Sequence, residues 1–360
     1  LPIYGNSRTM RFMTLAPAVV LLLAWLFLVS VPGHADQLEP GESEIGFLGF
    51  IRTDTYESYL DEHEGAARPM TEIRIPAVSF AESEGVELER VGAWEGRTNV
   101  LRWPDDEGSA TWELDIEEPG FYQFGMEYYP LESKNTVLEM EVRIDGELPF
   151  QAASRLTLNK LWVDEQGILT GPRGNEMRSR KVEVPQWTYA EFGDEEGKLD
   201  KPFSFYFDRG RHTITLGMMK GVFLIDELTL RNEPEPPSYA EVSAEYEAAG
   251  YEESSGHRVI IQAEYPKIRS DAIVHPQSDS SGPGTQPSHP TKIRLNTLGG
   301  QNWQYPLQWV TWEFEVPETG LYKIGIRAMQ SFRQGLYVTR SIRIDGERPV
   351  YELEQVEFLF

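Results

Sequence analysis

The chain has 360 residues, of which 58 are acidic and 33 are basic, so its formal net charge is -25 at pH 7. This charge disfavours nucleic acid and anionic lipid as partners, because both repel an acidic protein. The chain has no cysteine, which excludes disulfides, thiolate metal sites and cysteine nucleophiles. Its length allows two or three domains.

The N-terminal part predicts a signal peptide at residues 10–35. Arg11 precedes an apolar run at residues 15–29, and a small-residue cleavage site ends at Ala35. An uncleaved membrane anchor is the alternative, because residues 12–31 approach the roughly 20 apolar residues that span a bilayer. We favour cleavage and expect an extracellular or cell-surface protein, in which only this segment meets a membrane.

The next segments predict a helical lead-in at residues 36–71 and a jelly-roll domain at residues 72–232. In the second segment, short runs alternate apolar and polar residues and are interrupted by Gly, Pro, Asp and Asn, as strands and turns are. Because no long helical period lies between the runs, an antiparallel two-sheet sandwich is favoured over a parallel α/β sheet. Asp145 and Gly146 suit a tight hairpin, and the aspartate is interpreted as a turn residue rather than a calcium ligand.

The sequence of the first domain is partly repeated. Residues 110–126 (ATWELDIEEPGFYQFGM) recur as residues 310–326 (VTWEFEVPETGLYKIGI), and the same offset relates Trp103 to Trp303. The repeat predicts a linker with a helix at residues 233–256 and a second, truncated jelly roll at residues 257–360. The counterpart of residues 203–230 is missing, and we therefore expect the chain to be a fragment of a longer protein. The expected fold class is all-β, with two tandem antiparallel sandwiches and short connecting helices.

The sequence holds no catalytic motif of a familiar kind. Nucleophile elbows, phosphate-binding glycine loops, HExxH pairs and Cys/His metal spacings are all missing from it. His212, at the start of a predicted strand, is expected to make a structural hydrogen bond, and no carboxylate is paired with His275 or His289 in the sequence. We therefore expect a protein that is not an enzyme.

Tryptophans next to turns predict a ligand-binding surface. Trp103 and Trp303 precede equivalent strands, beside polar or turn residues. A flat ring in such a place can stack on the apolar face of a sugar, while neighbouring amide and charged groups bind its hydroxyls. The alternative is that both rings fill the end of the sandwich, as Trp112 is expected to fill the core. Further candidates for the binding surface are Tyr305, Trp309, Trp94 and Trp187.

Glu264 is the candidate metal ligand. It ends the first predicted strand of the second repeat, where an acidic residue can bind Ca²⁺ through oxygen. The first repeat has Val78 at the equivalent position, so only the second repeat keeps this ligand. A structural calcium ion is the one cofactor that the sequence suggests.

Two motifs of the second repeat carry a family resemblance. Trp-Glu-Phe-Glu-Val-Pro-Glu-x-Gly-x-Tyr-x-Ile-Gly, followed by Arg-Ile-Asp-Gly-Glu-x-Pro, resembles the galactose-binding-like jelly rolls of carbohydrate-binding module families 6 and 35. Gln262-Ala263-Glu264 and residues 210–216 look like the opening and late strands of those modules. The resemblance implies a carbohydrate ligand.

The order of the segments carries a second resemblance. Helix-plus-jelly-roll repeats behind a signal peptide are similar to the N-terminal half of large Gram-positive extracellular solute-binding proteins of sugar ABC transporters. This resemblance implies a transporter permease as a partner, through a C-terminal part that the chain lacks. Two alternatives remain open, namely ancillary modules of a polysaccharide-degrading enzyme and a structural surface spacer that binds nothing.

Overall fold

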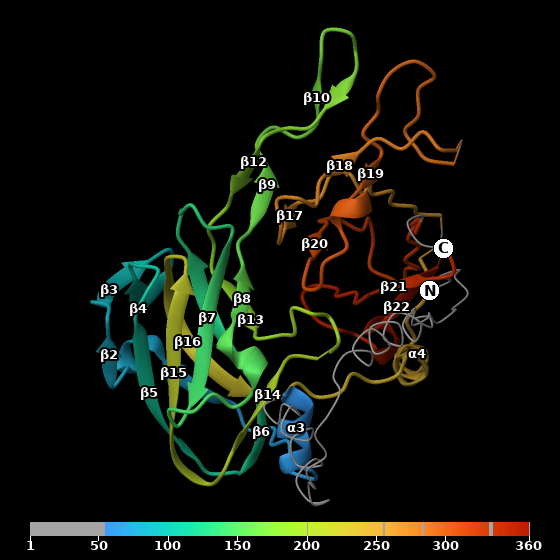
Figure 1. Cartoon of the computed structure of the whole chain (residues 1–360). Coiled ribbons are helices and arrows are strands. Elements are labelled where there is room, and N and C mark those ends of the chain that lie inside the picture. The colour runs from blue at the N-terminus through green and yellow to red at the C-terminus, as the bar shows by residue number, and fades with distance from the viewer. Residues whose placement is uncertain (1–54, 200, 255, 283, 331–333, 360) are drawn as a thin grey trace, which may run out of the picture. The chain divides into compact units, whose positions relative to one another are not determined.

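The structure is a computed structural model, and it describes residues 55–360 apart from residues 200, 255, 283, 331–333 and 360. The expected signal peptide lies outside these residues. The described chain consists of β-strands and loops with two α-helices (Figure 1). None of its helices is long and apolar enough to cross a membrane. Two compact units are formed, one by residues 54–235 and 246–321, the other by residues 236–245 and 322–360 of the described chain.

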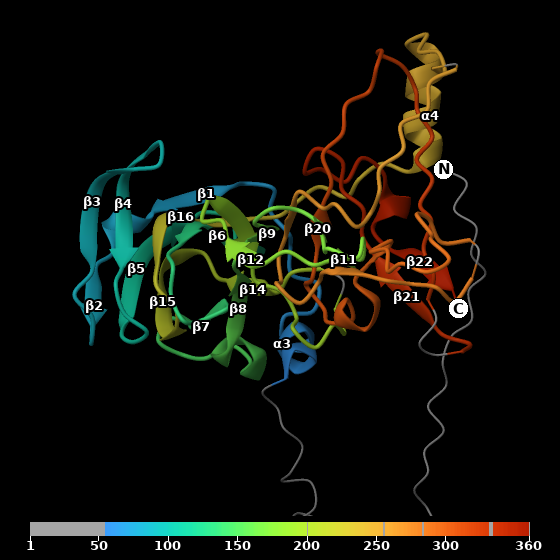
Figure 2. The ribbon, with the colours of Figure 1, turned by 90° about the horizontal axis from the view of Figure 1, so that it is seen from above.

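The first repeat folds as two antiparallel sheets, seen from above in Figure 2. One has the order β13-β6-β16-β4-β3, with β1 beside β16 and β14 beside β6. Its strands are β1 (Ile73–Pro76), β3 (Glu89–Trp94), β4 (Arg97–Trp103), β6 (Gly120–Pro130), β13 (Thr188–Glu191), β14 (Ser204–Phe207) and β16 (Phe223–Arg231). The other has the order β2-β5-β15-β7-β8, formed by β2 (Glu82–Glu84), β5 (Ser109–Ile116), β7 (Val137–Ile144), β8 (Leu156–Asn159) and β15 (Gly210–Lys220). The predicted β-sandwich is therefore confirmed.

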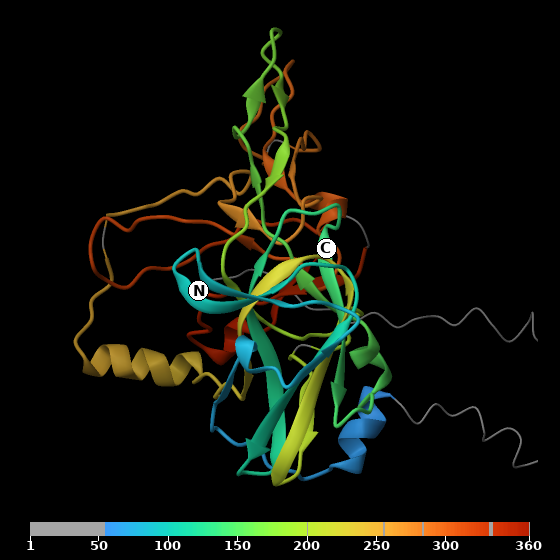
Figure 3. The ribbon, with the colours of Figure 1, turned by 90° about the vertical axis from the view of Figure 1, so that its left-hand side faces the viewer.

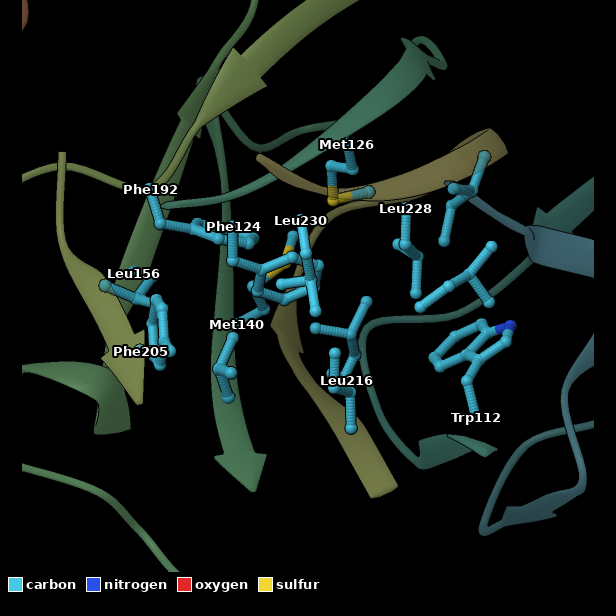
Figure 4. Packing of buried hydrophobic residues seen from close by; sticks show 14 of the residues in the cluster. Trp112, Phe124, Met126, Met140, Leu156, Phe192, Phe205, Leu216, Leu228 and Leu230 are labelled. Atoms are coloured by element: carbon cyan, nitrogen blue, oxygen red, sulfur yellow. The ribbon is translucent and has the colours of Figure 1, made fainter. Parts of the chain in front are cut away.

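Side chains from both sheets form one hydrophobic core (Figure 4). Trp112 of β5 is fully buried there, and its indole Nε1 donates a hydrogen bond of 2.9 Å to the carbonyl of Ala77. Alternate residues of β5 are buried, as expected for a strand with one face on the core. The prediction that Trp112 packs in the core is confirmed.

The turn at Asp145 and Gly146 is a tight hairpin turn, as predicted. Both residues have positive φ, 53° and 80°, which is the conformation that such turns require. The Asp145 carboxylate accepts a 2.8 Å hydrogen bond from the backbone N–H of Thr213, and it lies 2.7 Å from Nδ1 of His212. The aspartate and the histidine thus hold two strands together, which confirms both sequence-based interpretations.

The two α-helices occupy the two segments that precede the repeats. α3 (Tyr56–Glu62) covers the edge strand β14, because the hydroxyls of Tyr56 and Tyr59 accept hydrogen bonds from backbone N–H groups of that strand, at 2.9 and 2.7 Å. Free strand edges invite pairing with other chains, and this contact protects one of them. α4 (Tyr239–Ala248) begins with a capping box, in which Ser238 and Glu241 exchange side-chain to backbone hydrogen bonds.

A third sheet combines the two repeats. Its order is β12-β9-β17-β20, where β9 (Trp162–Asp164) and β12 (Lys181–Glu183) belong to the first repeat and β17 (Ile268–Arg269) and β20 (Val310–Thr311) to the second. Two short hairpins extend from it, and they consist of β10 (Leu169–Thr170) with β11 (Glu176–Met177) and β18 (Pro276–Gln277) with β19 (Thr297–Leu298).

The second repeat is an incomplete sandwich. The predicted strand from residue 310 onward forms only as the two residues of β20, whereas its counterpart β5 has eight. In the first repeat β5 pairs with strands on both of its edges, β2 and β15, whereas within the described residues β20 pairs only with β17. Phe314, which follows β20, is 48% exposed, while its equivalent Leu114 in β5 is 7% exposed.

The smaller unit contains the last strands of the chain. β21 (Tyr337–Arg340) pairs with β22 (Val356–Leu359) in an antiparallel hairpin. A small cluster of buried residues supports it, formed by Val242 of α4 together with Val350, Leu353 and Val356.

Candidate functional site

Three aromatic side chains meet on the outer face of the first sheet, and we call Trp94, Tyr129 and Trp187 the aromatic cluster. Trp94 ends β3 at a two-residue turn, Glu95-Gly96, in which both residues have positive φ. Tyr129 lies in β6 next to the buried Tyr128, so the alternation of the strand turns it away from the core. Trp187 immediately precedes β13, which pairs with β6.

The rings of the aromatic cluster pack edge to face. The Tyr129 ring lies 5.9 Å from the Trp94 ring at an interplanar angle of 81°, and 5.5 Å from the Trp187 ring at 63°. The Trp187 Nε1 donates a 3.3 Å hydrogen bond to the carbonyl oxygen of Trp94. Burial, and then the charge of Glu95, raise the pKa of Tyr129, so its hydroxyl stays protonated and can donate. The Trp94 side chain is the outermost, with 37% of the residue exposed.

Charged groups lie beside these rings. The Arg97 guanidinium is 6.0 Å from the centre of the Trp187 ring, within cation–π range. Its two terminal nitrogens contact the carboxylates of Glu127, at 2.6 Å, and Asp226, at 3.3 Å. Donors and acceptors with fixed directions are thus held next to an apolar surface, which is the combination that recognises polyhydroxylated rings.

The other predicted aromatic residues lie in a loop of the second repeat. Trp303 is half-buried, its ring 6.4 Å from that of Trp312, and its Nε1 donates to the carbonyl of Gln308 at 3.3 Å. Tyr305 is 57% exposed and Trp309 is 36% exposed. Within the described part of the chain, the rings of Tyr305 and Trp309 form no stacked or edge contact with another aromatic ring. The structure therefore brings together Trp94 and Trp187, but it does not join them with the candidates of this loop.

Trp103 does not have the position expected of a ligand-binding residue. It is fully buried, its ring lies 6.0 Å from that of Phe223 at an angle of 10°, and its Nε1 donates to the carbonyl of Glu107 at 3.1 Å. A ring in this position cannot stack on a ligand without leaving the core. The Trp103 ring instead fills the end of the sandwich, which was the alternative interpretation.

Glu264 is buried, with 2% of the residue exposed. Burial, and next the nearby charge of Glu176, raise the pKa of the Glu264 carboxyl. The Glu176 carboxylate itself binds Arg294 at 3.0 Å and the backbone N–H of Leu295 at 2.7 Å. Calcium takes six to eight oxygen ligands, yet the described residues contain no group of three or more His, Cys, Asp or Glu side chains arranged to hold a metal. Within the described residues Glu264 is therefore not part of such a group, and calcium binding stays a prediction.

No family model matches the sequence, and no curated protein matches it. Solved structures match parts of the chain at low similarity. One is the C-terminal CBM6 of LamC, a marine laminarinase from Zobellia galactanivorans, at 13% identity and a TM-score of 0.27, covering 45% of this chain and 100% of that chain. Another is a family 35 carbohydrate binding module from Clostridium thermocellum, at 11% identity and a TM-score of 0.26, covering 45% and 99%.

A third similar structure is the Podospora anserina GH26-CBM35 β-(1,4)-mannanase, at 14% identity and a TM-score of 0.27. The match covers 47% of this chain and 30% of that chain.

Sequence reasoning missed Tyr129 and the charged residues around Arg97. A signal for the tyrosine was present, since the adjacent pair Tyr128 and Tyr129 in a strand must place one ring on each face of the sheet. The partners of Arg97, Glu127 and Asp226, come from strands far apart in the sequence, and no local pattern connects them.

Proposed function

We propose that this chain is a non-catalytic carbohydrate-binding protein that holds a sugar on the aromatic cluster. The observation that carries the proposal is the packing of three rings, from β3, β6 and the residue before β13, beside one charged network. Trp94 offers an exposed indole face to the C–H groups of a pyranose, and the neighbouring carboxylates and the Tyr129 hydroxyl can bind its hydroxyl groups.

The charges of the site favour a neutral sugar. Arg97 lies over the Trp187 ring, and Glu127 and Asp226 both contact its guanidinium. Two carboxylates around one guanidinium leave a local excess of negative charge, which repels uronic acids and sulfated sugars. The ligand that fits best is therefore an uncharged glycan.

The test is affinity electrophoresis in gels that contain uncharged polysaccharides, such as mannan, xylan, laminarin and dextran. Trp94→Ala and Trp187→Ala are each expected to weaken retention about tenfold or more, the usual effect of truncating a central aromatic contact. Trp309→Ala is the matched control, because Trp309 is 36% exposed and Trp94 37%, and it should bind like the parent chain.

Two outcomes would contradict the proposal. One is that the parent chain is retained by none of a broad array of neutral glycans. The other is that Trp309→Ala abolishes retention while Trp94→Ala leaves it intact, which would move the site to the loop of the second repeat.

A role in sugar import, with a permease as partner and export to the cell surface, is the finer form of the same proposal. It is supported only by the order of the predicted segments, and it stays a prediction. The coding sequence after Phe360 tests it. A two-lobed binding domain there would favour the importer, whereas a glycosidase-type domain would favour the role as ancillary modules of an enzyme.

A further inference from the structure

A positively charged surface interrupts this acidic protein at the hairpins beyond the third sheet. We call residues 164–181 together with residues 289–294 the basic arm. These segments contain six Lys and Arg residues against three Asp and Glu residues, in a chain whose net charge is -25. The cationic residues are Arg173, Arg178, Arg180, Lys181, Lys292 and Arg294.

The two segments of the basic arm lie side by side and are hydrogen-bonded to one another (Figure 3). The backbone N–H of Glu176 donates to the carbonyl of Ile293 at 3.1 Å, and the backbone N–H of Ile293 donates to the Asn175 side chain at 3.0 Å. Arg294 contacts the Glu176 carboxylate at 3.0 Å. The two segments thus form one ordered platform, in which Arg294 keeps a fixed neighbour.

Four cations of the basic arm are available to a partner. Arg173, Arg178, Arg180 and Lys292 are exposed, and none of them forms an ion pair within the described residues. Two of the three acidic groups of the arm are engaged, since Asp164 contacts both Lys181 and the buried Arg269, and Glu176 contacts Arg294. The third, Glu165, lies opposite Arg180, to whose carbonyl its backbone N–H donates. An exposed cation without a neighbouring carboxylate keeps its full attraction for an external anion.

A neighbouring histidine also experiences the positive charge of the arm. Burial first, and then the charges of Arg178, Lys181 and Arg269, lower the pKa of His275. The arginines of the arm therefore act on the surrounding surface and not only on solvent.

We propose that the basic arm binds an anionic polysaccharide, a polymer of sugars that carry carboxylate or sulfate groups. The proposal does not depend on the aromatic cluster, which favours an uncharged ligand. Arginine presents a planar set of donors that matches a carboxylate or sulfate. Met177 and Ile293, which are 49% and 50% exposed, place apolar surface beside these cations for the C–H groups of the sugar rings.

A polysaccharide fits this surface better than a nucleic acid does. A duplex presents dense negative charge over a long distance, and the acidic remainder of the chain would repel it. A glycan with one charge per sugar or per disaccharide can meet the few cations of the arm locally. Its binding is expected to weaken as salt screens these contacts.

The test is affinity electrophoresis of the whole chain in gels containing polygalacturonate, dextran sulfate or uncharged dextran, at low and high ionic strength. Retention is expected with one or both anionic polymers at low salt, and it should exceed any retention that dextran gives through the aromatic cluster. The polymer that retains the chain tells carboxylate from sulfate recognition. The triple variant Arg173→Gln, Arg178→Gln, Arg180→Gln is expected to lose about tenfold or more of this affinity, as three cations leave the contact.

The matched control removes the same charge elsewhere. The control triple variant replaces three exposed cations outside the arm, Arg74→Gln, Lys201→Gln and Arg211→Gln. Its retention by the anionic polymers should change little. The double variant Trp94→Ala, Trp187→Ala should keep the anionic binding even if it loses a neutral glycan, so failure of one proposal is distinguishable from failure of the other.

Three results would overturn the inference. They are no retention of the parent chain by either anionic polymer, an equal loss in the control triple variant, and tighter binding to DNA than to the polysaccharides. Circular dichroism of each variant establishes that a loss of binding is not a loss of fold.

Discussion

Asp164→Ala is expected to detach the second repeat from the hairpin of the first repeat. The guanidinium of Arg269 is wholly buried and donates to the Asp164 carboxylate and, at 2.8 Å, to the carbonyl of Val274. Lys181 also contacts this carboxylate. Two cations from different parts of the sequence therefore depend on one acidic side chain.

The loss in free energy of unfolding expected for Asp164→Ala follows from the burial of Arg269. Removing one partner of a buried ion pair destabilises a protein by about 3–5 kcal/mol, because the remaining charge is left without compensation. The Asp164 side chain is 14% exposed, so water can reach part of the site after the change. We therefore expect a loss near the lower limit, about 3 kcal/mol.

The assay combines urea unfolding with amide hydrogen exchange. The backbone N–H groups of Lys267 and Ser270, which donate across β17 and β20 to Thr311 and Trp309, should lose protection first. The double variant Asp164→Ala, Arg269→Met should recover much of the loss, because the wholly buried charge of Arg269 is then absent as well. A loss below about 1 kcal/mol, or no recovery in the double variant, would refute the reasoning.

Three further changes test other parts of the structure. Gly120→Ala should destabilise the fold by about 1–3 kcal/mol in thermal unfolding, because φ is +152° and a Cβ would lie 2.4 Å from a backbone oxygen. Gly210→Ala is the control, since its φ is +137° but open space surrounds it, and it should lose less stability. Equal losses in the two variants would contradict the clash at Gly120. Trp112→Phe removes the buried indole hydrogen bond and should lower the free energy of unfolding by about 1–3 kcal/mol in urea; an unchanged midpoint would count against its core role. Since burial raises the pKa of Glu264, its ionisation weakens the fold as pH rises through that pKa, so Glu264→Gln should raise the melting temperature at pH 7 and give no gain below about pH 4. A lower melting temperature at pH 7 that calcium accentuates would instead support the calcium prediction.

The fold of the first repeat was predictable because its information is local. Alternation along Ser109–Ile116 places Trp112 on the buried face, and Asp145-Gly146 has the turn chemistry of a tight hairpin. Trp103 was misjudged for a local reason as well. It precedes a Pro-Asp-Asp turn and resembled a loop residue, but β4 continues as far as Trp103 and directs the ring into the core.

The aromatic cluster was only partly predictable. Trp94 and Trp187 were candidates as single residues, and nothing in the sequence indicated that they meet. Their meeting depends on the strand order β13-β6-β16-β4-β3, which brings the end of the β3–β4 hairpin to the same face as Tyr129. Such long-range pairing is determined by the tertiary fold and is not visible in a window of neighbouring residues.

The shared sheet β12-β9-β17-β20 means that the linker between the repeats is not a place where the gene can be divided without consequence. A product that ends before α4 would carry β9 with its outer edge unpaired, together with an Asp164 deprived of Arg269. Such a product invites edge-to-edge association. The two repeats therefore have to be expressed and studied as one piece.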